Sequence, residues 1–156
     1  MKSGMLSIKP KWCELIASGR KTIEVRKTRP KLETPFKCYI YCTSVKNLNL
    51  QDYVNVHRAT NGAVDDWSDK VIGEFVCDEV LQFYHDDYNS PAYDISDDDL
   101  NRTCLFQEDL YRYASGKTLY GWHVSDLVIY DEPRELSEYK IKRPPQSWCY
   151  VEEVRK

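Results

Sequence analysis

The sequence predicts an α+β fold: a small, mostly antiparallel β-barrel of about six strands, with two main helices at its ends. Two observations support this prediction. Six short stretches are rich in aromatic and β-branched residues, the composition typical of strands. Only two long helical patterns lie between them, without the regular strand–helix alternation of a parallel sheet. The length of 156 residues suits a single domain spanning residues 1–156.

The first elements are a short apolar strand at residues 5–8 and a helix that begins at Pro10. Proline suits the first helical turn because its missing N–H would have no helical partner there. Gly19 is the expected end of the helix, since glycine adopts positive φ without steric cost. The helix carries an apolar stripe at helical spacing, formed by Trp12, Leu15 and Ile16. A second strand is expected at about residues 21–27.

Four further strands are expected at residues 36–42, 71–77, 120–130 and 148–154, the third of them bent near Ser125 and Asp126. Residues 44–69 form a polar excursion, predicted to be loop with a helical turn near 50–58. Residues 84–116 form an acidic loop–helix region. Its helix is expected to begin between residues 97 and 103 and to end at Gly116, with an apolar side made by Leu105, Phe106, Leu110 and Tyr113.

Charge is unevenly distributed along the chain, whose net charge is −3. Residues 1–31 hold nine Lys or Arg against two acids, whereas the remainder holds thirteen against twenty-three. The overall negative charge argues against general coating of nucleic acid. A basic face on an acidic body favours selective capture of one anionic or polar group.

Composition also indicates which cofactors and which cellular location to expect. The six cysteines form no CxxC pair and no close His–Cys cluster, so we expect reduced thiols and neither a metal site nor a cofactor. No apolar run is long enough to span a bilayer, and no signal peptide opens the chain, so the expected location is cytoplasmic. The twelve Tyr and four Trp suit either a β-core or stacking surfaces for bases.

The most informative stretch is the corner at residues 19–26, where the first helix gives way to the second strand. Lys21 lies at the elbow, and the alternation of the strand places Glu24 and Arg26 on one face. Such a corner could be a surface strand with a simple ion pair, worth under about 1 kcal/mol. It could equally form the site of a polar ligand.

These residues resemble a known family. Leu6-Ser7-Ile8-Lys9-Pro10 followed by Gly19-x-Lys21-x-x-Glu24-x-Arg26 is similar to the signature of the ASCH domain, a member of the PUA-like superfamily. The strand at residues 71–74, the Tyr120-Gly121-Trp122-His123 strand and the Gln146-Ser147-Trp148 strand add to the resemblance, which covers residues 5–153. The chain also resembles small prophage-type ASCH proteins.

The resemblance implies a PUA-like β-barrel with a cleft beside the first helix, lined by the motif, and a ligand that is RNA or a modified nucleotide. In such a cleft Lys21 could donate to a phosphate or carbonyl, Glu24 could read an exocyclic amine of a base, and Arg26 could clamp a phosphate or hold Glu24 in place. The remaining candidate ligand-binding residues are Lys9, Tyr41, Trp122, His123, Gln146 and Ser147.

An enzymatic function and a protein-interaction role also stay open. Some small ASCH proteins resemble amidohydrolases that deacetylate N4-acetylcytidine with a Lys, a Thr and a Glu, and others have been described as ribonucleases. The lysine would be Lys21, acting as base or nucleophile together with Glu24, but Glu24 also occupies the position of the threonine. The candidate catalytic acids are Glu74, Glu108 and Asp109. A third possibility is a phage-type protein-interaction module that uses the acidic residues 84–109 to bind a protein partner of unknown identity.

Overall fold

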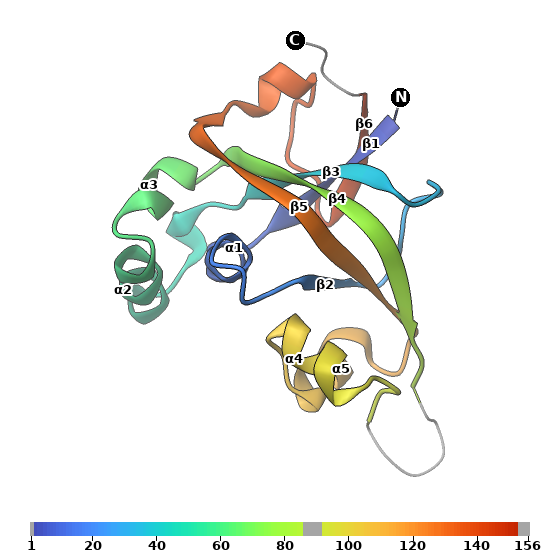
Figure 1. The fold of residues 1–156 in the computed structure, drawn as a ribbon. Helices are drawn as coiled ribbons and strands as arrows, with labels where there is room; N and C mark the ends of the chain where they lie inside the picture. The colour runs from blue at the N-terminus through green and yellow to red at the C-terminus, as the bar shows by residue number, and fades with distance from the viewer. Residues whose placement is uncertain (1, 86–91, 153–156) are drawn as a thin grey trace.

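The α+β fold with six strands is confirmed in the computed structural model, which describes residues 2–85 and 92–152. The strands form one sheet in the order β2-β5-β4-β3-β1-β6 (Figure 1). All neighbouring strands are antiparallel except β1 and β3, which run parallel. The bounds of the strands are β1 (Lys2–Ile8), β2 (Ile23–Arg26), β3 (Phe36–Cys42), β4 (Lys70–Phe83), β5 (Leu119–Arg134) and β6 (Trp148–Glu152).

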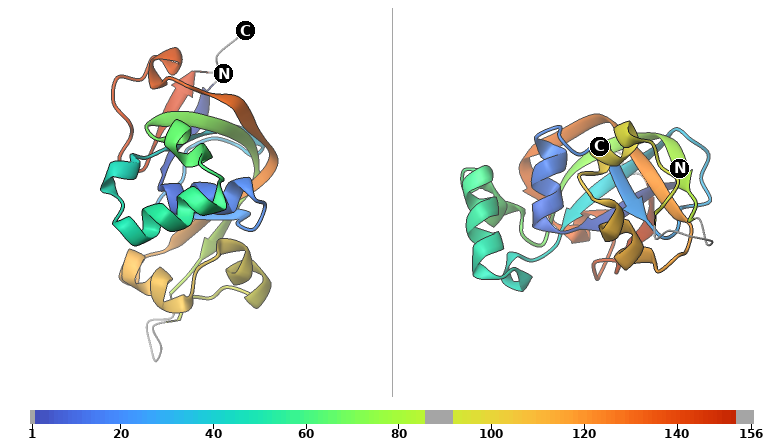
Figure 2. Two further views of the ribbon diagram at one scale, coloured as in Figure 1. Left: turned by 90° about the vertical axis from the view of Figure 1, so that its left-hand side faces the viewer. Right: turned by 90° about the horizontal axis from the view of Figure 1, so that it is seen from below.

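The sheet is strongly curved, and irregularities in its two longest strands accompany the curvature (Figure 2). The pairing of β4 with β5 shifts register at three points, as expected where β-bulges increase local twist. One shift lies at Asp126, whose φ of 46° confirms the predicted bend in β5. Curvature brings the outermost strands, β2 and β6, close enough for Arg26 in β2 to donate a hydrogen bond to Ser147, just before β6.

Helices are more numerous than the predicted two, because the polar excursion is helical. The described residues contain five α-helices, the first being α1 (Pro10–Ala17). The excursion forms α2 (Leu50–Ala59) and α3 (Ala63–Trp67), with a short 3₁₀ helix at Val45–Asn47 before them. The Asn49 side chain caps α2 by accepting from the Asp52 N–H. Both helices lie beyond α1 on one side of the sheet, where they bury Val56, Val64 and Trp67 in the core (Figures 1 and 2).

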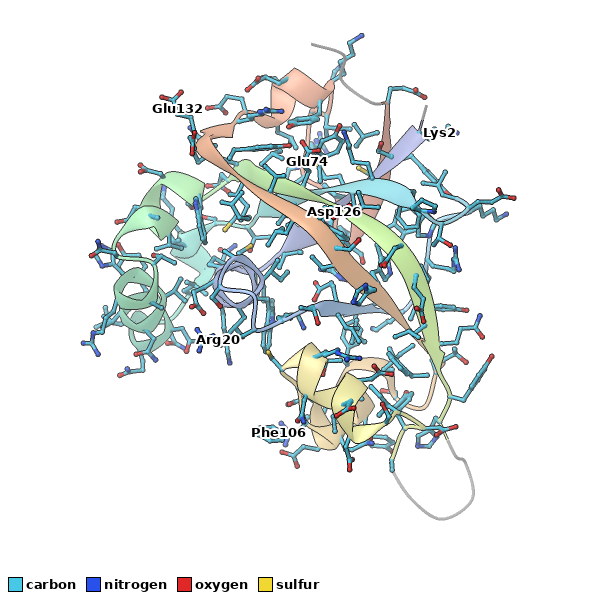
Figure 3. The ribbon with its side chains drawn as sticks, viewed as in Figure 1. Lys2, Arg20, Glu74, Phe106, Asp126 and Glu132 are labelled. Atoms are coloured by element: carbon cyan, nitrogen blue, oxygen red, sulfur yellow. The ribbon has the colours of Figure 1, made fainter. Side chains whose placement is uncertain are left out.

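The acidic region forms two helices where one was predicted. Its helices α4 (Asp97–Thr103) and α5 (Gln107–Ala114) lie beneath β2 (Figure 1). The break follows from the backbone of Cys104, whose φ of 58° ends α4 in the left-handed region. Phe106 becomes the residue before α5 and is 75% exposed rather than part of an apolar side (Figure 3). Leu110 is buried as predicted.

The last part of the chain also differs slightly from expectation. β5 extends to Arg134 and is followed by a 3₁₀ helix at Leu136–Tyr139, where connection alone was predicted. Residues 153–154 of the predicted final strand and residues 86–91 of the predicted acidic loop lie outside the described residues.

The closeness of β4 to β5 yields a stability prediction. A Cβ atom added at Gly73 in β4 would collide with the backbone carbonyl oxygen of Val128 in β5, which cannot move without disturbing the sheet. We expect Gly73→Ala to lower the free energy of unfolding by about 2 kcal/mol. At Gly4 in β1 the same atom would meet Cys38 Sγ at 3.6 Å, an ordinary contact. Gly4→Ala is therefore the matched control, and chemical denaturation of both variants is the measurement. Equal stabilities would contradict the prediction.

Candidate functional site

The corner between α1 and β2 places the charged motif inside the molecule. The backbone N–H groups of Arg20 and Lys21 both donate to the Leu15 carbonyl, while Gly19 adopts a φ of +82°. This arrangement ends the helix and turns the chain toward β2. Thr22 then anchors the turn, since its N–H donates to the Arg102 carbonyl and its own carbonyl accepts from Val124. The predicted role of Gly19 as the glycine following the helix is confirmed.

Lys21, Glu24 and Arg26 form a buried ion triad. Lys21 Nζ lies 3.4 Å from Glu24 Oε1, and Arg26 Nη2 lies 2.7 Å from Glu24 Oε2. Their side chains are 1%, 7% and 11% exposed, respectively, which excludes the interpretation of a solvated surface pair. Lys21 Nζ also donates to the Thr103 carbonyl at 2.5 Å and lies 5.0 Å from the centre of the Trp12 ring.

Arg26 connects the triad to two other strands. Its Nη2 donates to the Ser7 carbonyl at 2.7 Å, and its Nη1 donates to the carbonyl and hydroxyl oxygens of Ser147 at 3.1 and 3.2 Å. One guanidinium therefore joins β2, β1 and the segment that enters β6. This geometry matches the expectation that Arg26 holds Glu24 in place.

Within the triad, Glu24 and Arg26 each stabilise the charged form of the other. Burial alone would raise the pKa of Glu24, but the positive charges of Arg26 and Lys21 outweigh it and hold the pKa below the ordinary carboxyl value. Burial likewise opposes the charge on Arg26, yet the carboxylate of Glu24 raises the pKa of Arg26 above its ordinary value. Glu24 is thus an ionised carboxylate in a buried position.

A cavity of about 850 Å³ opens above the triad. It brings together seven of the nine residues that the sequence nominated: Lys9, Lys21, Glu24, Arg26, Tyr41, Gln146 and Ser147. Lys9 and Gln146 are exposed, whereas Tyr41 is buried and donates a hydrogen bond to Asp69 at 3.3 Å. Tyr41 therefore forms a wall of the cavity.

The other two nominated residues lie elsewhere. Trp122 is fully buried in the core, where its ring contacts Phe36 and Trp148 and its Nε1 donates to the Thr28 carbonyl. It has no free face on which a base could stack. His123 does not line the cavity, and its Nδ1 lies 2.6 Å from Asp78 Oδ1. Because consecutive side chains in β5 point to opposite faces of the sheet, Trp122 and His123 face different sides, and neither side chain lines the cavity.

The three candidate catalytic acids also differ in position. Glu74 lies in β4 and does not line the cavity (Figure 3). It pairs with Lys37 and accepts a hydrogen bond from Tyr130. Glu108 is exposed on α5. Asp109 lines the cavity, but its Oδ2 accepts the Phe106 N–H at the start of α5. Helix capping accounts for the position of Asp109.

Several cavity residues were not identified as site residues from the sequence. Trp12 satisfies the helical spacing of the core stripe, yet its ring covers Lys21 and lines the cavity. Tyr113 was expected on the apolar side of a helix and is instead 41% exposed at the cavity. Local spacing cannot separate a core aromatic from one that faces a cavity, because both obey the same period. The others include Ser7, Lys27, Thr28, Asn47, Asp69 and Leu105.

Two further structural findings concern metals and membranes. Within residues 2–85 and 92–152, no three His, Cys, Asp or Glu side chains gather so that they could hold a metal ion. No helix in this described part of the chain is long and apolar enough to cross a membrane.

Comparison with known proteins gives a family and a fold. The ASCH domain family matches residues 6–85. No curated protein matches the chain. Among solved structures, the ASCH protein of Zymomonas mobilis superposes with a TM-score of 0.64 at 17% identity, covering 97% of this chain and 88% of that one. The first of two single-substitution variants of that protein gives a TM-score of 0.63 at 18% identity, covering 98% of this chain and 92% of that one. The second gives a TM-score of 0.63 at 17% identity, covering 97% of this chain and 89% of that one. At these identities the likeness concerns the fold alone.

The bridging role of Arg26 predicts a large effect of a small change. Lysine cannot reproduce the guanidinium fork, so Arg26→Lys would leave acceptors on Ser7 and Ser147 without donors. We expect a loss of about 2 kcal/mol in the free energy of unfolding. The control is Arg20→Lys, since Arg20 pairs with Glu14 but is 62% exposed (Figure 3). There the loss should stay below about 1 kcal/mol. Similar losses for the two variants would show that the fork is dispensable.

The lowered pKa of Glu24 predicts how stability depends on pH. A carboxyl whose folded pKa is depressed stabilises the fold fully above its unfolded pKa, and the contribution is lost as pH falls through the folded value. The stability difference between the unchanged protein and Glu24→Gln should therefore be constant above the ordinary value of 4.5 and shrink below it. Urea unfolding across this range is the measurement. A difference that grows on acidification would contradict the sign.

Proposed function

The chain belongs to the ASCH domain family, a PUA-like fold associated with RNA binding, and on that basis we propose that it binds RNA or a modified nucleotide by holding one base in the cavity above Lys21, Glu24 and Arg26. The observation that carries the proposal is a buried carboxylate, paired with two cations, among the residues that line that cavity. Its volume of about 850 Å³ is within the range of small-molecule sites, roughly 300–1,000 Å³.

The energetics of the triad support a binding role. Burying three charges costs several kcal/mol of desolvation, and apolar residues of similar size would often be as stabilising. Fold stability alone therefore gives little reason for charges at this position. A polar floor beneath an open cavity has a use if it recognises polar groups of a ligand.

The walls and mouth suit the other parts of a nucleotide. Trp12 and Tyr113 are aromatic and partly exposed, and base–aromatic stacking is worth about 1–3 kcal/mol per base. Lys9 and Lys27 are exposed at the cavity and could attract backbone phosphates. Lys27 also lies over the Tyr113 ring, 4.8 Å from its centre.

The geometry favours binding over hydrolysis. Lys21 Nζ is held by two oxygens and covered by Trp12, so it is poorly placed to attack a bond or to accept a proton. The threonine of the amidohydrolase pattern is replaced by Glu24, and an ionised carboxylate pinned by two cations is a poor general acid. The deacetylase and the ribonuclease remain alternatives that the next experiment separates from binding.

Binding and turnover can be measured on one set of samples. The purified protein is dialysed against N4-acetylcytidine, unmodified nucleosides or short single-stranded RNAs, and both retained ligand and products are quantified by chromatography. We expect saturable binding without product. Product formation that disappears in Lys21→Ala would establish an enzyme instead, and neither binding nor product would refute the proposal.

Salt dependence tests the role proposed for the cavity lysines. For single-stranded RNA, each phosphate contact changes the slope of log affinity against log salt by about 0.7. Lys9→Ala should make this negative slope less steep by about 0.7. Lys117→Ala removes an exposed lysine that does not line the cavity and should leave the slope unchanged. An unchanged slope in Lys9→Ala would remove Lys9 from the site.

A further inference from the structure

The hydrogen-bonding capacity of the ion triad is unevenly used. An ammonium has three N–H donors and a guanidinium has five. Lys21 directs its donors at the Thr103 carbonyl, at Glu24 Oε1 and toward the Trp12 ring. Arg26 uses four of its five, two on Ser147, one on Ser7 and one on Glu24. Little donor capacity is left for a ligand.

Acceptor capacity, by contrast, remains. An ionised carboxylate has about four lone-pair sites, two on each oxygen. Within the described residues, Oε1 of Glu24 has one partner, Lys21, and Oε2 has one partner, Arg26. One lone pair on each oxygen is therefore unused, and Glu24 lines the cavity. The two carboxylate oxygens of Glu24 form a pair of adjacent acceptors.

The bases differ in what they would present to such a pair. On its Watson–Crick edge, guanine has two adjacent donors, N1–H and the N2 amino group. Adenine and cytosine each place one amino donor next to an unprotonated ring nitrogen, whose lone pair would face a carboxylate oxygen. Uracil has a single N–H between two carbonyl oxygens. Only guanine matches two acceptors side by side.

We infer that the cavity selects a guanine-type base, one with two adjacent N–H donors on its Watson–Crick edge, and that Glu24 is the residue that determines this specificity. The inference rests on the proposed function and names the class of ligand for the same site. The guanine carbonyl O6 needs a donor as well. The exposed Gln146 amide lines the cavity and makes no hydrogen bond to the described residues, so it can provide one.

A nucleoside panel on the unchanged protein tests the inference without any mutation. Guanosine and 7-deazaguanosine carry the same donor pair and should bind alike. Inosine lacks the N2 amino group and should bind about tenfold more weakly, as should adenosine and cytidine. In 1-methylguanosine the N1 donor is blocked, and binding should be lost. Isothermal titration calorimetry gives each affinity.

The outcomes separate the inference from the proposed function. Equal affinities for guanosine and inosine, or a preference for cytidine or adenosine, would overturn the guanine assignment while leaving nucleotide binding intact. Failure of all nucleosides and of single-stranded RNA to bind would overturn both.

Glu24→Gln provides a second, independent test. An amide offers one acceptor and one donor, which suits the amino group and ring nitrogen of adenine or cytosine. The variant should lose guanosine affinity about tenfold or more and gain relative affinity for cytidine and adenosine. Circular dichroism checks that the Glu24→Gln protein folds. If it does not fold, the nucleoside panel on the unchanged protein still tests guanine selectivity. Glu108→Gln, an exposed acid on α5, is the matched control and should bind as the unchanged protein does. A folded Glu24→Gln protein that still prefers guanosine would refute the role of Glu24.

Discussion

The Arg26–Glu24 ion pair is the constraint on which the site depends. Without Arg26, the carboxylate of Glu24 would be buried with only Lys21 to balance it, at a cost of several kcal/mol. The same guanidinium ties β2 to the Ser7 carbonyl and to Ser147, so the charge balance and the closure of the curved sheet share one side chain. One side chain therefore connects Glu24 to β1 and to the segment before β6.

Under the proposed function, this arrangement would help the carboxylate to recognise a ligand. An acceptor that is already oriented loses less entropy on ligand binding than a mobile one does. Lys21 and Arg26 hold Glu24 from both sides, and Trp12 shields Lys21 from solvent. The two cations therefore fix the position of the carboxylate.

The local part of the site could be predicted from sequence, and the long-range part could not. Gly19 as a helix end and the shared face of Glu24 and Arg26 follow from short-range rules of backbone geometry. The partners of the triad lie far along the chain, at Thr103 and Ser147, and no local pattern places them there. The six strands were predictable from composition, whereas the helices of residues 44–69 depend on caps and on burial against the core.

The two helical insertions supply side chains to the walls of the cavity. Asn47 and Asp69 reach it from the insertion between β3 and β4, and Leu105 and Tyr113 from the one between β4 and β5. Within the described residues of these insertions, 43–69, 84–85 and 92–118, no segment forms a strand of the sheet. Under the proposed function, the side chains of these insertions that line the cavity could differ with the sugar, flanking nucleotide or base modification, while the sheet that carries Glu24 and Arg26 stayed unchanged. Related proteins built this way could share one recognition group and diverge in everything that surrounds it.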